Sequence, residues 1–180
     1  MKKRLNTTLV GAIAVVFATH SAAANFTGTP FEEAGDTFQI DPALIYAVSL
    51  AESARGQSGQ RVAPHPYTLR VADQPGFYAS TLEEAHEHLS TLLESHRSID
   101  ICLMQVNTRW NGHRVNSPHD LLDIKTCIFT GAEILREAID SAPGDLALGI
   151  GRYYNWNDEA AARNYGNRVL SFYQNLPLGW

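Results

Sequence analysis

The chain has 180 residues, with 14 basic and 19 acidic side chains, and 44% of its residues are apolar. Three basic residues and no acidic ones lie in the first 24, which have the pattern of a signal peptide, so the remainder has 11 basic against 19 acidic residues and a net charge of −8. This charge argues against nucleic acid or an anionic membrane surface as the partner, and about 155 residues are enough for one domain with a real core.

The N-terminal stretch has the three parts of a signal peptide. Residues 2–4 are basic, the apolar run Leu9–Ala18 follows, and the alanines at 22–24 offer a cleavage site. The apolar run is too short to be a stable membrane anchor. We therefore expect export to the bacterial periplasm, cleavage that leaves 25–180 as a single domain, and no transmembrane anchor after cleavage.

The first two predicted helices each begin with a capping residue followed by proline. Thr29-Pro30 opens the first helix, and Asp41-Pro42 opens the second, which covers 41–53. A side-chain oxygen at the N-cap accepts from a free amide N–H of the first turn, and proline at the first helical position loses no hydrogen bond. Gly56 is a plausible C-terminal stop for the second helix.

Glu52 lies on the apolar face of the second helix. Ile45 and Val48 precede it in steps of three and four, which places the three side chains on one side. A carboxyl group on a buried face, near the negative end of the helix dipole, has a raised pKa because its charged form is disfavoured. An acid that is protonated near neutral pH is what general-acid cleavage of a glycosidic bond requires. The alternative is a solvated glutamate in the last turn.

The segment 57–79 breaks the helical pattern with glycines and prolines. Residues 67–71 alternate and are β-prone, turn residues follow, and Phe77-Tyr78 can return as a second strand. We predict a small β-hairpin insertion over 67–78. Residues 98–107 are predicted to form a loop that runs into a short turn.

The rest of the chain is predicted to be helical. Ser80 or Thr81 caps a third helix, and Gly131 within a long one suggests close helix–helix approach. Further helices are predicted from 117 onward and over 124–142, 144–154 and 158–176. The expected fold is therefore mainly α, with six or seven helices and one small hairpin. Helical spacing predicts core faces made by Leu82, Ala85, Leu89, Leu92 and Leu93, by Cys127, Ile128, Gly131, Leu135 and Ala138, and by Tyr165, Val169 and Phe172.

Common metal and cofactor motifs are missing from the sequence. It contains no HExxH, Walker or GxSxG motif, which argues against a zinc peptidase, an NTPase and an α/β-hydrolase. His86 and His88 are two positions apart, so they face different sides of their helix and are interpreted as solvated. We expect no cofactor and no metal site.

The chain has two cysteines, Cys102 and Cys127. Export to an oxidising compartment makes a single disulfide between them plausible. Such a bridge would join the stretch around residue 103 to the start of the long helix. The alternative is two buried free thiols.

Several short motifs follow one another along the chain. They are Glu52-Ser53, the stretch 102–107 (CLMQVN), the stretch 127–135 (CIFTGAEIL), a "YN" element within 153–155, and the stretch 163–170 (RNYGNRVL). In this order they resemble the "ES", "GLMQxN", "NI..GA.IL", "YN" and "RNYxxRVL" motifs of the lytic transglycosylases of the SLT, family 1, lysozyme-like group. The insertion after "ES" looks like that of the small exported enzymes encoded with conjugation and secretion machinery.

The resemblance implies a lysozyme-like fold and an activity on peptidoglycan strands, for local opening of the wall by a conjugation or secretion apparatus. Glu52 would first protonate the bond between N-acetylmuramic acid and N-acetylglucosamine, and then accept the proton of the C6 hydroxyl, which closes a 1,6-anhydro ring. No second carboxylate is needed in this scheme, and Asp100, the nearest candidate, is interpreted as a loop residue that caps or faces solvent.

The resemblance also assigns groove residues. Met104 and Gln105 would line the groove beside the scissile bond, and Ser53 would orient the acid or the neighbouring sugar. Tyr153 or Tyr154 would hydrogen-bond Glu52, since the register of the "YN" element is ambiguous. Tyr165 would pack or bond nearby, and all three tyrosines could instead be ordinary core or rim residues.

Two departures and two alternatives accompany this interpretation. Cys102 stands where the family usually has glycine, which would narrow the groove if that glycine allows close approach of the sugar. Ala161-Ala162 replaces the family's Glu-Thr. The alternatives are a lysozyme-type muramidase that hydrolyses the same bond, and a non-catalytic peptidoglycan-binding or scaffold module.

Overall fold

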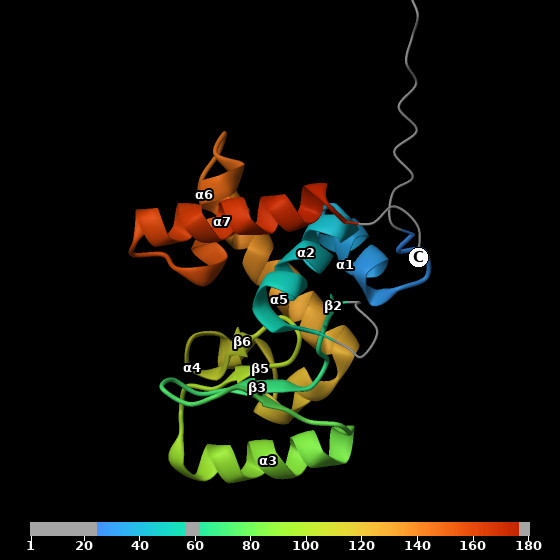
Figure 1. Ribbon diagram of the computed structural model, residues 1–180, viewed down its shortest axis with the longest axis vertical. Helices are drawn as coiled ribbons and strands as arrows, with labels where there is room; N and C mark the ends of the chain where they lie inside the picture. The colour runs from blue at the N-terminus through green and yellow to red at the C-terminus, as the bar shows by residue number, and fades with distance from the viewer. Residues whose placement is uncertain (1–24, 57–61, 177–180) are drawn as a thin grey trace, which may run out of the picture.

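The computed structural model describes residues 25–56 and 62–176. Within these residues the protein has seven α-helices, two 3₁₀-helices and two small antiparallel sheets (Figure 1). The predicted mainly-α fold with a small β insertion is confirmed. The signal peptide predicted over 1–24 lies outside the described residues. Among the helices of the described ranges, none combines the length and the apolar character that crossing a bilayer would need.

Local capping sets where the helices begin. Each of the seven α-helices follows a residue whose side chain accepts from an N–H of the first turn, namely Thr29, Asp41, Thr81, Asn107, Asp123, Asp145 and Asp158. Thr81 rather than Ser80 therefore caps the third helix. The helices are α1 Pro30–Phe38, α2 Pro42–Ser53, α3 Leu82–Ser95, α4 Thr108–Asn111, η1 Gly112–Arg114, η2 Pro118–Leu122, α5 Ile124–Asp140, α6 Leu146–Tyr154 and α7 Glu159–Gln174.

The larger sheet has four strands in the order β4-β3-β5-β6. The predicted hairpin is present, with Thr68 opposite Tyr78 across β3 and β4. The loop predicted over 98–107 is wrong, because two-residue strands there continue the sheet. These strands are too short for their own pattern to reveal them, and they form because β3 offers a free edge. The strands are β3 Thr68–Arg70, β4 Phe77–Tyr78, β5 Asp100–Ile101 and β6 Val106–Asn107.

A second, two-stranded sheet follows α2 directly. The helix ends at Ser53, and β1 (Ala54–Gly56) pairs antiparallel with β2 (Val62–Pro64). The prediction that Gly56 stops the helix is therefore wrong, since the chain has already become extended two residues earlier. The backbone carbonyl of Ser53 accepts from the N–H of His65, which fixes this change of direction.

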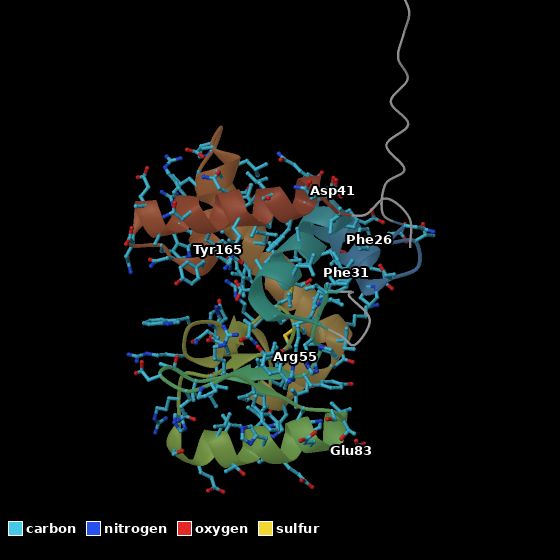
Figure 2. All side chains as sticks on the ribbon, in the orientation of Figure 1. Phe26, Phe31, Asp41, Arg55, Glu83 and Tyr165 are labelled. Carbon is cyan, nitrogen blue, oxygen red and sulfur yellow. A yellow bond between two sulfur atoms is a disulfide. The ribbon has the colours of Figure 1, made fainter. Side chains whose placement is uncertain are left out.

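The helices and the larger sheet occupy different ends of the molecule. In Figure 1, α1, α2, α6 and α7 form one group, α3 covers the far side of the sheet, and α5 extends between the two. Figure 2 shows Asp41 and Tyr165 in the helical group and Glu83 on α3 at the opposite end. The end of α2, which carries Glu52, faces the sheet between them.

Glycines allow a close helix contact between α6 and α7. A Cβ at Gly151 would lie 2.0 Å from the carbonyl oxygen of Ala162, and one at Gly166 would lie 1.9 Å from that of Ala147. The helix contact predicted at Gly131 is wrong, because Gly131 faces the side chain of Met104, 2.7 Å from the position of a Cβ. The backbones of α6 and α7 can approach closely because these positions lack side chains.

Most predicted core faces are buried as expected. On α5, Cys127, Ile128, Leu135 and Ala138 are fully buried, and Tyr165 and Val169 are buried on α7. Leu82 and Phe172, both 37% exposed and both near the ends of their helices, are exceptions.

Candidate active site

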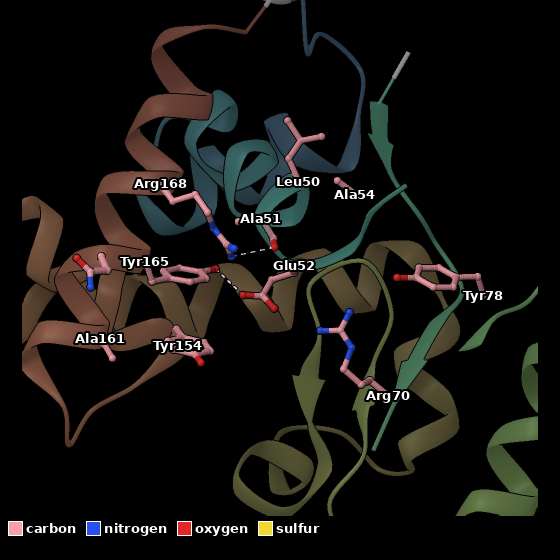
Figure 3. Close-up of a pocket in the computed structure, with 11 residues that line it drawn as sticks. Leu50, Ala51, Glu52, Ala54, Arg70, Tyr78, Tyr154, Ala161, Tyr165 and Arg168 are labelled. Atoms are coloured by element: carbon pink, nitrogen blue, oxygen red, sulfur yellow. Dashed lines mark hydrogen bonds between the residues drawn. The ribbon is translucent and has the colours of Figure 1, made fainter. Parts of the chain in front are cut away.

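Glu52 lies in the last turn of α2, where two hollows of about 740 and 240 Å³ meet. Both are lined by Glu52, Arg70 and Tyr154, so together they form one groove with the carboxyl group at its centre (Figure 3). Side chains that line only one hollow include Tyr78, Tyr165 and Arg168 in the larger, and Asp100, Gln105, Asn107 and Tyr153 in the smaller.

The carboxyl group of Glu52 is held by a tyrosine of α7. The Tyr165 hydroxyl donates to Oε1 of Glu52 at 2.5 Å, as the dashed line in Figure 3 marks. Burial raises the pKa of Glu52 to about 7, against an opposing effect of the Tyr165 hydrogen bond, and the nearby charge of Asp100 raises it further. Glu52 is therefore partly protonated at neutral pH, as its place on the apolar face predicted.

The three tyrosines of the predicted site take different positions. Tyr165 is the one that hydrogen-bonds Glu52, whereas the prediction assigned that bond to Tyr153 or Tyr154. Tyr153 instead donates to the carbonyl oxygen of Met104 at 2.7 Å. Tyr154 is 61% exposed and stacks on Tyr165, with ring centroids 5.1 Å apart. The choice between Tyr153 and Tyr154 as the partner of Glu52 could not be made from the sequence. Neither of these α6 residues is the partner, because the hydrogen bond comes from α7.

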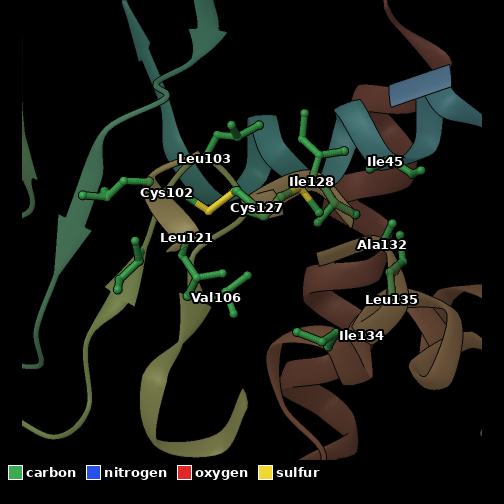
Figure 4. Packing of buried hydrophobic residues seen from close by; sticks show 14 of the residues in the cluster. Ile45, Cys102, Leu103, Val106, Leu121, Cys127, Ile128, Ala132, Ile134 and Leu135 are labelled. Carbon is green, nitrogen blue, oxygen red and sulfur yellow. A yellow bond between two sulfur atoms is a disulfide. The ribbon is translucent and has the colours of Figure 1, made fainter. Parts of the chain in front are cut away.

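A four-residue loop, Cys102–Gln105, contributes Gln105 to the lining of the smaller hollow and is tied to several elements. Its first link is a disulfide to Cys127 on α5, which confirms the predicted bridge (Figure 4). The Cα atoms of the two cysteines are 6.4 Å apart. Cys102 has a φ of +70°, the left-handed region that glycine adopts most easily. The Cys102 side chain is 1% exposed, so the narrowing of the groove that was expected from a cysteine at this position does not occur.

Ser53 supplies the second link of the loop. Its hydroxyl donates to the carbonyl oxygens of Leu103, at 2.8 Å, and of Ser49, at 3.0 Å. Ser53 is 1% exposed and lines neither hollow, so the structure agrees with the expected role of orienting the acid and not with the alternative of orienting a neighbouring sugar. Its contribution is to fix the end of α2, and thus Glu52, relative to the loop.

Of the two predicted groove residues Met104 and Gln105, only Gln105 has its side chain in the groove. The Met104 side chain is fully buried against Gly131, so only its carbonyl group remains near the site, as acceptor for Tyr153. Gln105 lines the smaller hollow with a φ of +50°, and its Nε2 donates to the carbonyl oxygens of Thr68 and Cys102. Among the described residues, the buried Oε1 of Gln105 has no hydrogen-bond partner, so it is free to accept from a ligand hydroxyl.

Asp100 is a second carboxylate in the groove, and the prediction of a loop residue facing solvent is wrong. It lies on β5 and lines the smaller hollow together with Glu52. Burial raises the pKa of Asp100, whereas a 2.7 Å hydrogen bond from Asn107 and the charge of Arg70 lower it. Ile99 and Ile101 on either side are fully buried, and this alternation was the available signal that Asp100 points the opposite way, into the groove.

The histidines of the described ranges do not gather into a metal site. His86 stacks on His119, with ring centroids 5.3 Å apart, and His88 stacks on Phe77 at 3.8 Å. In the part of the chain that the structure describes, no group of three or more histidine, cysteine and acidic side chains could hold a metal ion.

Removing the disulfide should destabilise the protein. Replacing both Cys102 and Cys127 with serine is expected to lower the free energy of unfolding by about 3 kcal/mol, because the bridge restricts the unfolded chain. Chemical denaturation of the variant and of the oxidised wild type measures the difference, and reduced wild type should match the variant. Equal stabilities, or two reactive thiols in unreduced, unfolded wild type, would show that the bridge is absent.

The raised pKa of Glu52 has a consequence for stability. The pKa is about 7 in the folded protein against an ordinary value of 4.5, so folding favours the protonated acid and stability is lost as the pH rises between these values. Glu52→Gln removes this loss, and the variant should gain about 3 kcal/mol over wild type between pH 4 and pH 8. Denaturation at both pH values measures the gain.

The matched control is Glu94→Gln, which changes an exposed side chain of α3 in the same way. The gain between the two pH values should be clearly larger for Glu52→Gln than for this control. If Glu52→Gln behaves like Glu94→Gln, the carboxyl group of Glu52 is not shielded from water.

Comparisons of the chain with models of known protein families, with characterised proteins and with solved structures gave no match. What the protein does is therefore inferred from the chemistry of the groups around Glu52 and from the short motifs that carry them.

Proposed function

We propose that the protein is a peptidoglycan lytic transglycosylase that cleaves the β-1,4 bond between N-acetylmuramic acid and N-acetylglucosamine without using water. The observation that carries the proposal is the Glu52 carboxyl group, which lies at the centre of a groove with a pKa of about 7. A carboxylic acid that holds its proton near neutral pH can donate it to a glycosidic oxygen.

In the proposed reaction Glu52 acts twice. It first donates its proton to the oxygen of the glycosidic bond, the bond breaks, and the N-acetylglucosamine side leaves as an alcohol. The substrate's own N-acetyl group stabilises the positive centre that develops on the muramic acid ring. The Glu52 carboxylate then takes the proton of the C6 hydroxyl of the same ring, and that oxygen closes the 1,6-anhydro bond. Glu52 ends protonated, and no water is consumed.

Tyr165 supports both steps. Because Oε1 of Glu52 accepts from the Tyr165 hydroxyl, the proton of the neutral acid is carried by Oε2. The same hydrogen bond becomes stronger when Glu52 is ionised, so it stabilises the carboxylate formed by the first step. Burial raises the pKa of Tyr165 well above its usual range, which keeps this hydroxyl a donor throughout.

The groove offers binding groups beside Glu52, one in the smaller hollow and one where the two hollows meet. Gln105 has a buried acceptor atom in the smaller hollow, and Tyr154 presents an exposed aromatic ring at the boundary of the two hollows. Amide groups and aromatic rings together suit amphipathic sugar rings. We therefore include a polysaccharide strand, bound across both hollows, in the proposal.

The proposal also includes a place of action. Peptidoglycan lies outside the cytoplasmic membrane, which agrees with the signal-peptide pattern of residues 1–24. The resemblance to enzymes encoded with conjugation and secretion machinery supports local opening of the cell wall for such an apparatus as the biological role.

Asp100 favours a second candidate, a muramidase that hydrolyses the same bond. Glycoside hydrolases pair a protonated acid with a carboxylate across the scissile bond. Asp100 lines the same hollow as Glu52 and accepts a hydrogen bond from Asn107, which helps to hold its charged form. In that case Asp100 would activate water or attack the sugar, and the product would carry a reducing end.

Digestion of purified sacculi by wild type, Glu52→Gln and Asp100→Asn, with mass spectrometry of the products, tests the proposal. Wild type should release anhydro-muropeptides, with activity lost at pH values well above 7, where Glu52 is ionised. Glu52→Gln should lose at least 10²–10⁴-fold in rate, the typical contribution of one acid or base. Asp100→Asn should retain most activity, with its pH profile displaced to lower pH because the charge that raises the pKa of Glu52 is gone.

Three results would contradict the proposal. Reducing ends as the main product, together with inactivity of Asp100→Asn, would show a hydrolase. Binding to sacculi without any cleavage would show a non-catalytic module. Undiminished release of muropeptides by Glu52→Gln would show that another group is the acid.

A further inference from the structure

The larger hollow contains arginines that lack acidic partners. Arg70 and Arg168 both line it, and Arg55 lies over the ring of Tyr78, a third lining residue, at 4.5 Å. None of these three arginines forms an ion pair with another of the described residues. By contrast, the basic side chains of Arg114, Lys125, Arg136 and Arg163 all pair with carboxylates elsewhere.

Arg70 is the most available of the three. Arg168 donates to the carbonyl oxygen of Ala51 at 3.1 Å and lies over the Tyr165 ring, so its position is fixed. The guanidinium group of Arg70 makes no hydrogen bond to the described part of the chain, and Arg70 lines both hollows. In Figure 3 Arg70 and Arg168 extend toward Glu52 from opposite sides of the hollow, and Figure 2 shows Arg55 between the helical group and α3.

The acidic groups nearby offset the positive charge of the larger hollow only in part. Glu52 is its one acidic lining residue, and burial keeps the pKa of that acid near 7. Asp100 stands opposite Arg70 across β5 and β3, and the two charges interact, but Asp100 lines only the smaller hollow, accepts from Asn107 and forms no ion pair with Arg70. The chain as a whole is acidic, with 19 acidic against 14 basic residues. Unpaired guanidinium groups in a groove of an acidic protein attract an anionic ligand group locally.

We propose that Arg70, supported by Arg168 and Arg55, binds a carboxylate carried on the lactyl arm of muramic acid, so that the protein prefers acidic glycan strands to neutral ones. This inference rests on the proposed function. The planar guanidinium group suits a carboxylate because two parallel N–H groups can donate to its two oxygens. The carboxylate can belong to a peptide stem attached to the lactyl arm, or to the lactyl group itself where the peptide has been removed.

Binding by a variant that cannot turn over tests the inference. In a Glu52→Gln background, affinity is measured by calorimetry for three ligands: a neutral N-acetylglucosamine hexamer, peptide-bearing glycan strands, and glycan strands stripped of peptide by an amidase. At least one acidic strand should bind about tenfold or more tightly than the neutral hexamer, the ratio expected for a charge-assisted hydrogen bond. Added salt should reduce that ratio.

Substitutions at Arg70 and at a control position, Arg97, test which arginine causes the preference for acidic strands. Adding Arg70→Gln should abolish the preference for acidic strands, and Arg70→Lys, which keeps the charge, should retain part of it. Arg97→Gln removes the same charge from an exposed position outside both hollows and should leave the preference unchanged. Thermal melting shows whether each variant is folded, and the lysine variant provides the test if the glutamine variant is not.

The outcomes separate this inference from the proposed function. Tighter binding of peptide-bearing strands identifies the peptide carboxylates as the ligand, and tighter binding of stripped strands identifies the lactyl carboxylate. Equal affinity for neutral and acidic glycans, or an equal loss from Arg97→Gln and Arg70→Gln, would overturn the inference while leaving the transglycosylase proposal intact. Failure to bind any of the three glycans would overturn both.

Discussion

The candidate site depends on one constraint, the attachment of the loop Cys102–Gln105 to the elements around it. The loop is joined to α5 by the disulfide, to α2 through Ser53, to α6 through Tyr153, and to β3 through Cys102 and Gln105. Two of its four residues have positive φ values, so the backbone is held in a conformation that a free chain rarely adopts. These attachments fix the distance between the helix that carries Glu52 and the sheet that carries Asp100.

The proposed chemistry depends on two opposing effects on the pKa of Glu52. Burial favours the neutral acid, whereas the Tyr165 hydroxyl favours the carboxylate, and burial is the larger effect. An acid with this balance can release its proton and recover it, because neither form is strongly preferred near neutral pH. The arginines of the larger hollow add positive charge beside the acid without pairing with it, which leaves them available for substrate. The same groove therefore combines an acid, a base and a potential anion site.

Features that depend on residues close together in the sequence, such as helix starts, could be predicted from the sequence. The starts of α1 and α2 followed from their capping residues, and Glu52 followed from its spacing to Ile45 and Val48. The sequence left a bridge between the two cysteines and two free thiols as alternatives, and the structure has the bridge. Tertiary contacts decided the rest: Asp100 enters the groove because β5 joins β3, and Tyr165 reaches Glu52 because α7 packs beside α2. The sequence could not predict these positions, since each depends on an element far away along the chain.

The central claim is that Glu52 is an acid with its proton still bound near neutral pH. A ¹³C NMR titration of its side-chain carboxyl carbon measures this property directly, with Glu52→Gln used to assign the signal. The account predicts a pKa of about 7 in the wild type and a higher one in Tyr165→Phe, which removes the hydrogen bond that favours the carboxylate. A pKa close to the ordinary 4.5 would contradict the account, since Glu52 would then be ionised at neutral pH and unable to protonate a glycosidic oxygen.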